Sequence, residues 1–316
     1  MMRFRAAQTV VVVGLVAACL GAGAVLRRAR DASYPPPPVA EDSLYVTSGR
    51  SLRYMTAGYT ALGADLYWIR AIQYYGSNRI VLTGGADPPA PPPTPSGYPL
   101  LYPLLDLTTS LDPRFNIAYR FGSIFLAEAV PGGAGRPDLA IKLLEKGLVH
   151  RPDKWEYMQD IGFVHYWWTH DFQAAAGWFD RASQVPGAPW FLRSLAATTL
   201  AEGGDRRSSK VMWESIRATA EIEWLKNEAD RRLMQLLALD QLDALQPLVD
   251  AFTRATGAPP SDWTPLIRAG RLRGVPLDPS GTAQYEIDAA GRVGLNRKSP
   301  LFPLPVEPQR QMAPPA

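Results

Sequence analysis

The stretch that decides the fold spans residues 137–152 and reads PDLAIKLLEKGLVHRP. It places Ala140, Leu144 and Gly147 at intervals of 4 and 3 residues, on one face of a helix that Pro152 follows. The same spacing recurs 35 residues later, and again after a further 34. The recurring positions are Ala175, Phe179 and Ala182, and then Ser209, Trp213 and Ile216. Self-similarity at such a period predicts a repeated pair of helices.

The first helix of each pair carries a glycine, Gly122 in one and Gly162 in the next. Two antiparallel helices approach closely where small side chains face each other, so we expect Gly122 to face Ala140 and Gly162 to face Ala175. The bulky residues of the second helices, Leu144, Phe179 and Trp213, would then fill the gap to the next pair. A single pair cannot bury its apolar face alone, and we therefore expect the pairs to stack.

These positions resemble the tetratricopeptide repeat (TPR) family. The resemblance implies an all-α fold in which antiparallel helix hairpins stack as a right-handed solenoid. It is good over residues 113–152 and 153–187 and degenerate over 188–219, and residues 221–257 are a candidate for a fourth, strongly diverged pair. The first repeat departs from the family by about six additional residues at 130–135. The second has His165 where a tyrosine is usual.

The resemblance also implies a concave groove that is lined by the first helix of each pair and binds peptide segments. The groove-facing positions would be Asn116, Tyr119 and Ser123 in the first pair, Gln159, Phe163, Tyr166 and Trp167 in the second, and Arg193 and Ala197 in the third. Four of them are aromatic, and aromatic side chains dominate binding hot spots. Two occupants remain open: a partner's segment, or another part of this chain such as the N-terminal helix or the Pro-rich tail.

The N-terminus predicts membrane targeting. Arg3 and Arg5 precede an uncharged run over residues 6–26, which further arginines close. At about 1.5 Å per residue this run is long enough for the hydrocarbon core of a bilayer. We interpret residues 1–30 as an uncleaved signal anchor, with the bulk of the chain periplasmic. A cleaved signal at residues 22–24 and a lipoprotein with a lipidated Cys19 are the alternatives.

The rest of the chain divides by composition. Residues 31–48 read as a Pro-rich spacer, 49–78 as an amphipathic helix, and 79–97 as a Pro-rich loop. The helical repeats would then occupy residues 98–257. Residues 258–316 are expected to form a mostly irregular extension and Pro-rich tail, with a small β-hairpin whose turn contains Gly291.

The residue types favour a binding protein over an enzyme. The net charge is +3 with basic and acidic residues intermixed, which does not indicate a nucleic-acid binder. The single cysteine and three scattered histidines offer no ligand spacing for a metal, and no nucleophile or phosphate-loop motif is present. We therefore expect a scaffold that binds another protein or a peptide segment, without cofactor or small-molecule substrate. The alternative is an envelope hydrolase on a helical-repeat scaffold.

Overall fold

The computed structural model describes residues 2–33, 44–83 and 97–307 and divides the chain into two compact units, Met1–Tyr45 and Val46–Ala316. The first unit contains one helix, α1 (Met2–Ser33), whose side chains are exposed over residues 14–30. Within the described ranges, no helix is both long and apolar enough to cross a membrane. Anchoring at residues 1–30, signal cleavage and lipidation of Cys19 stay predictions. The proline runs at 35–38 and 88–95, and the tail beyond 307, lie outside the described residues.

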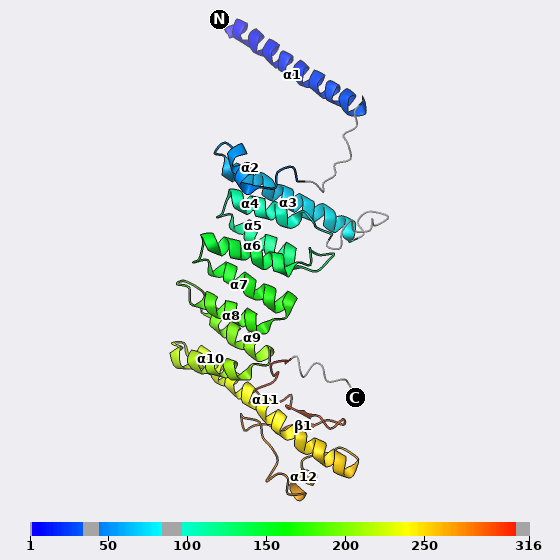
Figure 1. Cartoon of the computed structure of the whole chain (residues 1–316), viewed down its shortest axis with the longest axis vertical. Helices are drawn as coiled ribbons and strands as arrows, with labels where there is room; N and C mark the ends of the chain where they lie inside the picture. The colour runs from blue at the N-terminus through cyan, green and yellow to red at the C-terminus, as the bar shows by residue number, and fades with distance from the viewer. Residues whose placement is uncertain (1, 34–43, 84–96, 308–316) are drawn as a thin grey trace. The chain divides into compact units, whose positions relative to one another are not determined.

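The second unit is a succession of helices in which each packs on the next, from α3 and α4 to α10 and α11 (Figure 1). The all-α class is confirmed. The helices are α2 (Gly49–Met55), α3 (Thr60–Leu82), α4 (Leu101–Leu111), α5 (Asn116–Ala127), α6 (Pro137–His150), α7 (Trp155–Val164), the π-helical η1 (His165–Thr169), α8 (Phe172–Ser183), α9 (Phe191–Glu202), α10 (Arg206–Thr219), α11 (Glu223–Thr256) and α12 (Thr264–Arg268).

Local signals place the helix boundaries where the repeat pattern predicts them. The Asp171 and Asp205 side chains accept hydrogen bonds from backbone amides in the first turns of α8 and α10, at 2.9 and 3.0 Å. Pro137 begins α6, where a missing N–H costs nothing. Helices α5 and α6, α7 and α8, and α9 and α10 pack on each other, and so do the intervening neighbours α6 with α7 and α8 with α9. The helices expected over residues 113–219 are therefore present, and each packs on the next.

Glycines allow these helices to approach closely, although not by the small-to-small contact expected. A Cβ at Gly162 would lie 2.4 Å from the Phe179 ring, so the glycine makes room for that buried ring. A Cβ at Gly122 would lie 2.8 Å from Leu105 of α4 and 3.2 Å from Leu143 of α6. The nearest side chains at Gly122 are thus leucines and not Ala140. A leucine branch fills the space that the missing side chain leaves, which keeps the interior close-packed.

Residues 221–257 do not form a fourth pair. They form the single helix α11, which is 34 residues long and ends at Gly257 with φ +80°. That left-handed conformation suits glycine and stops the helix. Pro247 lies inside α11, where proline removes one backbone hydrogen bond without ending the helix. The sequence lacks the Gly-Gly or Pro-Gly break that separates the preceding pairs.

The C-terminal extension folds back along α11. The predicted hairpin is confirmed: β1 (Glu286–Ile287) pairs antiparallel with β2 (Val293–Gly294), and Gly291 takes φ +79° in the turn. Residues 299–307 are not a free tail, because the buried Gln235 amide of α11 donates to the Leu301 and Pro303 carbonyls at 2.8 and 2.7 Å. This segment thereby becomes part of the core around α11.

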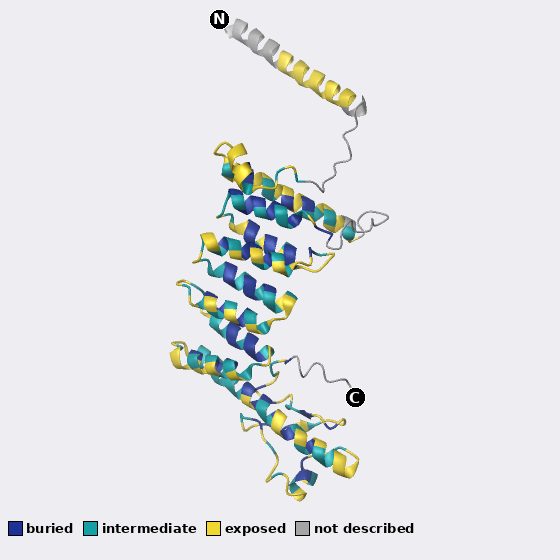
Figure 2. Cartoon of the chain, in the orientation of Figure 1, coloured by how far each residue is buried: buried dark blue, intermediate teal, exposed yellow. Residues whose placement is uncertain are grey.

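The amphipathic helix expected at 49–78 is two helices, α2 and α3, separated by a turn in which Ala57 and Gly58 have positive φ. Helix α3 continues past Gly76, the expected end, to Leu82. It packs on α4 through the small residues of one face, which include Gly63, Ala64 and Ala71. A row of large apolar residues along α3, which begins at Tyr59 just before the helix, lies outward and is between 41% and 72% exposed (Figure 2): Tyr59, Leu62, Leu66, Ile69 and Ile72.

Candidate partner-binding cleft

A cleft of about 540 Å³ lies between α5 and the segment formed by α7 and η1. Apolar and aromatic side chains make up most of its wall, and two carboxylates complete it. The lining residues are Ser123, Ile124, Glu128, Asp160, Phe163, Val164, Trp167 and Trp168. The repeat pattern predicts α5 and α7 as the first helices of consecutive pairs, so the cleft lies where that pattern predicts a groove. We call it the α5–α7 cleft.

Neighbouring aromatic rings hold the aromatic side chains of the cleft wall in place. The Phe163 ring packs edge-on against the buried Phe179 ring of α8, at 5.1 Å between centroids. Trp167 is 60% exposed and packs edge-on against Tyr166 at 4.9 Å. A partly exposed indole that is held by its neighbours has already lost much of its rotational freedom. It can therefore contribute contact area to a bound segment at low entropic cost.

The π-helical turn at η1 positions both tryptophans. A π-turn contains one more residue than an α-turn, which shifts the following side chains around the axis, and such turns are frequent at functional sites. Here Trp167 and Trp168, adjacent in sequence, both line the cleft. The segment ends at His170, which has φ +52° and is one of the two non-glycine residues with positive φ in the described chain. The backbone at the cleft is thus locally strained.

One ion pair supplies most of the electrostatic character of the cleft. The Arg120 guanidinium donates to both Asp160 carboxylate oxygens, at 2.6 and 3.0 Å. Burial raises the pKa of the Asp160 carboxyl above its ordinary value, and the ion pair with Arg120 opposes that shift. A carboxylate held in two hydrogen bonds is positioned to orient a polar group of a ligand. It is poorly placed to move as a catalytic acid or base.

Three of the predicted groove residues border this cleft: Phe163, Trp167 and Ser123, of which Ser123 is only 1% exposed and donates its hydroxyl to the Arg120 carbonyl at 2.7 Å. Asn116 is exposed at the start of α5 and Gln159 is half-buried on α7, and neither borders the cleft. Tyr166 lies beside it, with its hydroxyl donating to Glu202 of α9 at 2.6 Å. Burial, together with the Glu202 carboxylate, raises the pKa of Tyr166 to about 12. Tyr166 therefore ties η1 to the next helix pair.

Two predicted groove residues are inside the core, and their assignment is wrong. Tyr119 is 0% exposed, because Gly147 of α6 leaves the space that its ring fills beside Tyr157. Ala197 is also 0% exposed, packs near Trp213, and offers its carbonyl to the Ser209 hydroxyl at 2.7 Å. Neither side chain can contact a partner in this structure.

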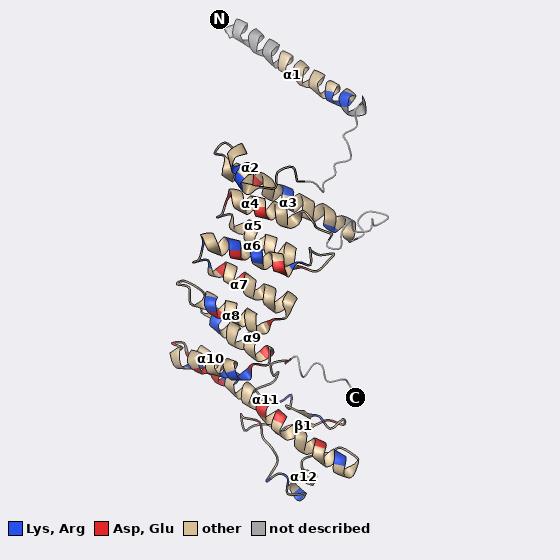
Figure 3. Cartoon of the chain, viewed as in Figure 1, with Lys and Arg blue, Asp and Glu red and all other residues tan. Residues whose placement is uncertain are grey.

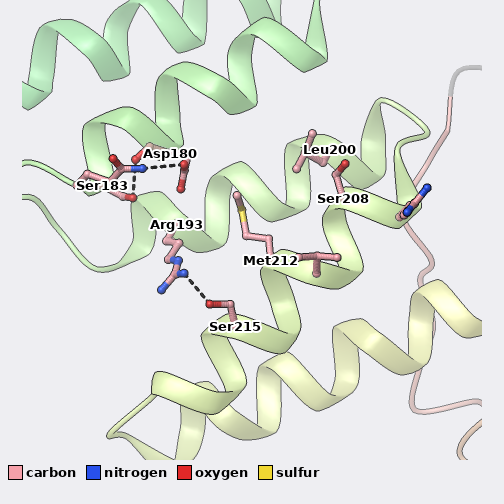
Figure 4. A pocket seen from close by; sticks show the side chains of 10 residues that line it. Asp180, Ser183, Arg193, Leu200, Ser208, Met212 and Ser215 are labelled. Atoms are coloured by element: carbon pink, nitrogen blue, oxygen red, sulfur yellow. Dashed lines mark hydrogen bonds between the residues drawn. The ribbon is translucent and has the colours of Figure 1, made fainter.

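Arg193 belongs to a different pocket, between α8, α9 and α10 (Figure 4). This pocket has a volume of about 640 Å³ and a more polar wall. Arg193 donates to the Ser215 hydroxyl at 2.7 Å, and the Gln184 amide donates to the Asp180 carboxylate at 2.9 Å. These polar groups already satisfy one another, which leaves less for a ligand to gain than in the α5–α7 cleft.

Sequence reasoning missed five lining residues: Ile124, Glu128, Asp160, Val164 and Trp168. Ile124 is adjacent to Ser123 on α5, and Glu128 follows Ile124 by four residues at the C-cap, so both lie on a helix face next to the one that the pattern identified. Trp168 carried no such signal, because a regular α-helix would turn it away from Trp167. In the described part of the chain no three His, Cys, Asp or Glu side chains gather as a metal site.

Comparison with known proteins finds no match among protein-family models, curated proteins or solved structures. The functional interpretation consequently depends on the geometry of this chain. Two features carry it: a succession of helices in which each packs on the next, and an open aromatic cleft between α5 and the segment formed by α7 and η1.

Proposed function

We propose that this chain is a non-catalytic adaptor of the TPR type that binds an apolar segment of a partner protein in the α5–α7 cleft. The observation that carries the proposal is Trp167, a large aromatic side chain that remains 60% exposed on the wall of an otherwise apolar cleft. Exposed aromatic residues beside a concavity are typical of binding hot spots.

The shape and chemistry of the cleft favour an amphipathic helix or an extended segment as the ligand. Phe163, Val164 and Ile124 provide an apolar floor for one aliphatic or aromatic anchor residue. Asp160, with Arg120 beside it, and Glu128 offer polar contacts at the edge. A partner segment with a bulky apolar residue next to a hydrogen-bond donor would satisfy both parts.

The same proposal includes the right-handed solenoid and an N-terminal attachment to a bacterial membrane, with the helical unit on the periplasmic side. Support for the solenoid comes from the 34- and 35-residue offsets and from the packing of consecutive helices. Support for attachment comes from the arginine-bounded apolar run at residues 6–26. An adaptor of this arrangement would recruit a partner to the membrane surface.

Photo-crosslinking tests the cleft directly. A benzoylphenylalanine replaces Trp167 in the full chain, and in a matched control it replaces Trp224, which is also 60% exposed but lies on α11. After illumination of cells, the proposal expects one dominant protein adduct from position 167 and not from position 224. Mass spectrometry then identifies the crosslinked segment, which should contain an apolar anchor residue.

Binding of that segment, prepared as a peptide, is then measured by calorimetry on the Trp167→Ala and Trp224→Ala variants. Loss of a hot-spot indole should weaken binding by at least about 30-fold, corresponding to about 2 kcal/mol. Trp224→Ala should leave it unchanged. Equal adducts from both positions, or equal affinity of the two variants, would remove the basis for the cleft as the binding site.

A further inference from the structure

The outward face of α3 carries an apolar stripe that the described residues do not cover. Leu62, Leu66 and Ile69 are 58%, 59% and 48% exposed, and Ile80 continues the stripe at 57%. The opposite face of α3 packs on α4. Apolar side chains exposed in a continuous row mark an interaction surface.

The row has the spacing of a coiled-coil seam. Intervals of 4, 3, 4, 3 and 4 residues separate the successive positions of the row, which are Leu62, Leu66, Ile69, Gln73, Gly76 and Ile80. This is the heptad pattern by which two helices pack knobs into holes. A single polar residue in such a seam, here Gln73, fixes the register because it pairs with its own copy. Gly76 allows close approach near the end of the helix.

Two charges of opposite sign flank the row. Asp65 and Arg70 are five positions apart, hence about 140° apart around the helix, with Leu66 and Ile69 between them. In the described part of the chain neither side chain makes an ion pair or hydrogen bond. In a parallel two-stranded coiled coil, flanking residues separated by five positions lie opposite each other across the seam. Asp65 of one helix would therefore meet Arg70 of an identical parallel helix.

We propose that α3 pairs in parallel, in register, with α3 of a second copy of this chain. The charge complementarity decides between occupants. An antiparallel pair would instead place the flank that carries Asp65 along the same flank of the other helix, and the Arg70 flank along the Arg70 flank, so that like charges would share a side of the seam. An anionic membrane surface would favour basic residues on both flanks and would repel Asp65. In the parallel pair both α3 helices run in the same direction, so their N-terminal ends lie together. The pairing does not involve the α5–α7 cleft and does not depend on it.

Sedimentation equilibrium of the full chain in density-matched detergent tests the pairing. The expected mass is twice the 34.7 kDa of one chain. Leu66→Lys should give the monomer mass, because it places a charge in the seam. Asp65→Arg and Arg70→Asp should each weaken dimerisation by about tenfold or more, since each sets like charges opposite one another. The double variant Asp65→Arg with Arg70→Asp should restore the wild-type dissociation constant.

Disulfide formation fixes the direction of the pair. With Cys19→Ser as background, Leu66→Cys should crosslink to its own copy on oxidation, because equivalent seam positions face each other in a parallel pair. Val211→Cys, 62% exposed on α10, is the control and should not crosslink. A monomeric wild type, a dimer that survives Leu66→Lys, or a charge swap that fails to rescue would each overturn the proposal.

Discussion

The two ends of the second unit differ in whether other residues of the chain cover their apolar surface. At the C-terminal end, residues 258–307 cover α11: Tyr285 and Leu301 are 2% and 1% exposed, and Leu304 packs on the same core (Figure 2). At the other end α3 keeps its apolar stripe outward. Every stack of helix pairs has apolar surface left at both ends, and a cap is required where it is not shared. This chain supplies one cap from its own sequence and, on our proposal, obtains the other from a second copy.

The largest expected effect is the loss of the C-terminal cap in Tyr285→Ala. The Tyr285 ring is buried against α11, its hydroxyl donates to the Gln241 side chain at 2.7 Å, and its carbonyl accepts from the Trp263 indole at 2.6 Å. Removing a buried aromatic ring costs about 3–5 kcal/mol of unfolding free energy. A urea titration followed by circular dichroism measures this. Tyr54→Ala, at an 81% exposed residue, is the control, and a cost below about 1 kcal/mol at Tyr285 would show that the extension does not cap the stack.

A slightly smaller effect is expected at the ion cluster that joins the end of the extension to α10 and α11, two helices that both carry basic and acidic residues (Figure 3). Arg206 donates to both oxygens of the buried Glu307 carboxylate at 2.6 Å and also pairs with Asp240 and Asp243. The Glu307 hydrogen bonds, with the two aspartates, raise the pKa of the Arg206 guanidinium further above its ordinary value. Arg206→Ala should cost about 3 kcal/mol, because it removes both guanidinium hydrogen bonds to a buried carboxylate.

The exposed pair of Arg136 with Asp138 is the matched control for Arg206. Arg136→Ala should change the unfolding free energy by less than about 1 kcal/mol, as surface pairs do. The same urea titration compares the two. Equal effects would mean that Glu307 is not held in the core, and that the C-terminal segment contributes little to the cap.

A third effect links the cap to pH. Burial raises the pKa of the Asp278 carboxyl, but hydrogen bonds from Ser280, Ser299 and backbone amides outweigh it, so the pKa lies below its ordinary value. A lowered pKa in the folded state means that the stabilisation is present above pH ~4 and is lost as the pH falls below that value. Asp278→Asn should therefore cost about 1–2 kcal/mol at pH 7. In thermal melts its deficit in Tm should shrink as the pH falls below about 4, and a deficit independent of pH would contradict the assignment.

The contrast between the ends also shows what the sequence can predict. The spacing of Ala140, Leu144 and Gly147 predicts helix pairs, and the turn at Gly291 predicts the hairpin, because both signals are local. The same kind of spacing at Leu62 and Leu66 identifies an apolar face but not what covers it. Periodicity reports which residues share a face, and burial depends on what packs there.

The cleft was only partly predictable for related reasons. Phe163 and Trp167 share a face of the first helix of a pair, and the pattern finds them. The burial of Tyr119 depends on Gly147 in another helix, and the position of Trp168 depends on a π-turn for which the sequence has no marker. The spacing of residues along the sequence therefore does not predict packing between separate helices or irregular turns of the backbone.

The smallest expected effect on stability is at the uncovered end, and it separates the two ends most clearly. Leu66→Lys changes a side chain that is 59% exposed, so the unfolding free energy of the monomer should change by less than about 0.5 kcal/mol. Leu104→Lys on α4, at 1% exposure, should unfold the first helices and serves as the buried control. If only folded chains dimerise, a higher protein concentration stabilises the folded state. The Tm of the wild type should therefore rise with protein concentration, and the Tm of Leu66→Lys should not. A Leu66→Lys protein destabilised at every concentration would instead show that the stripe of α3 is covered within its own chain, and the contrast between the two ends would disappear.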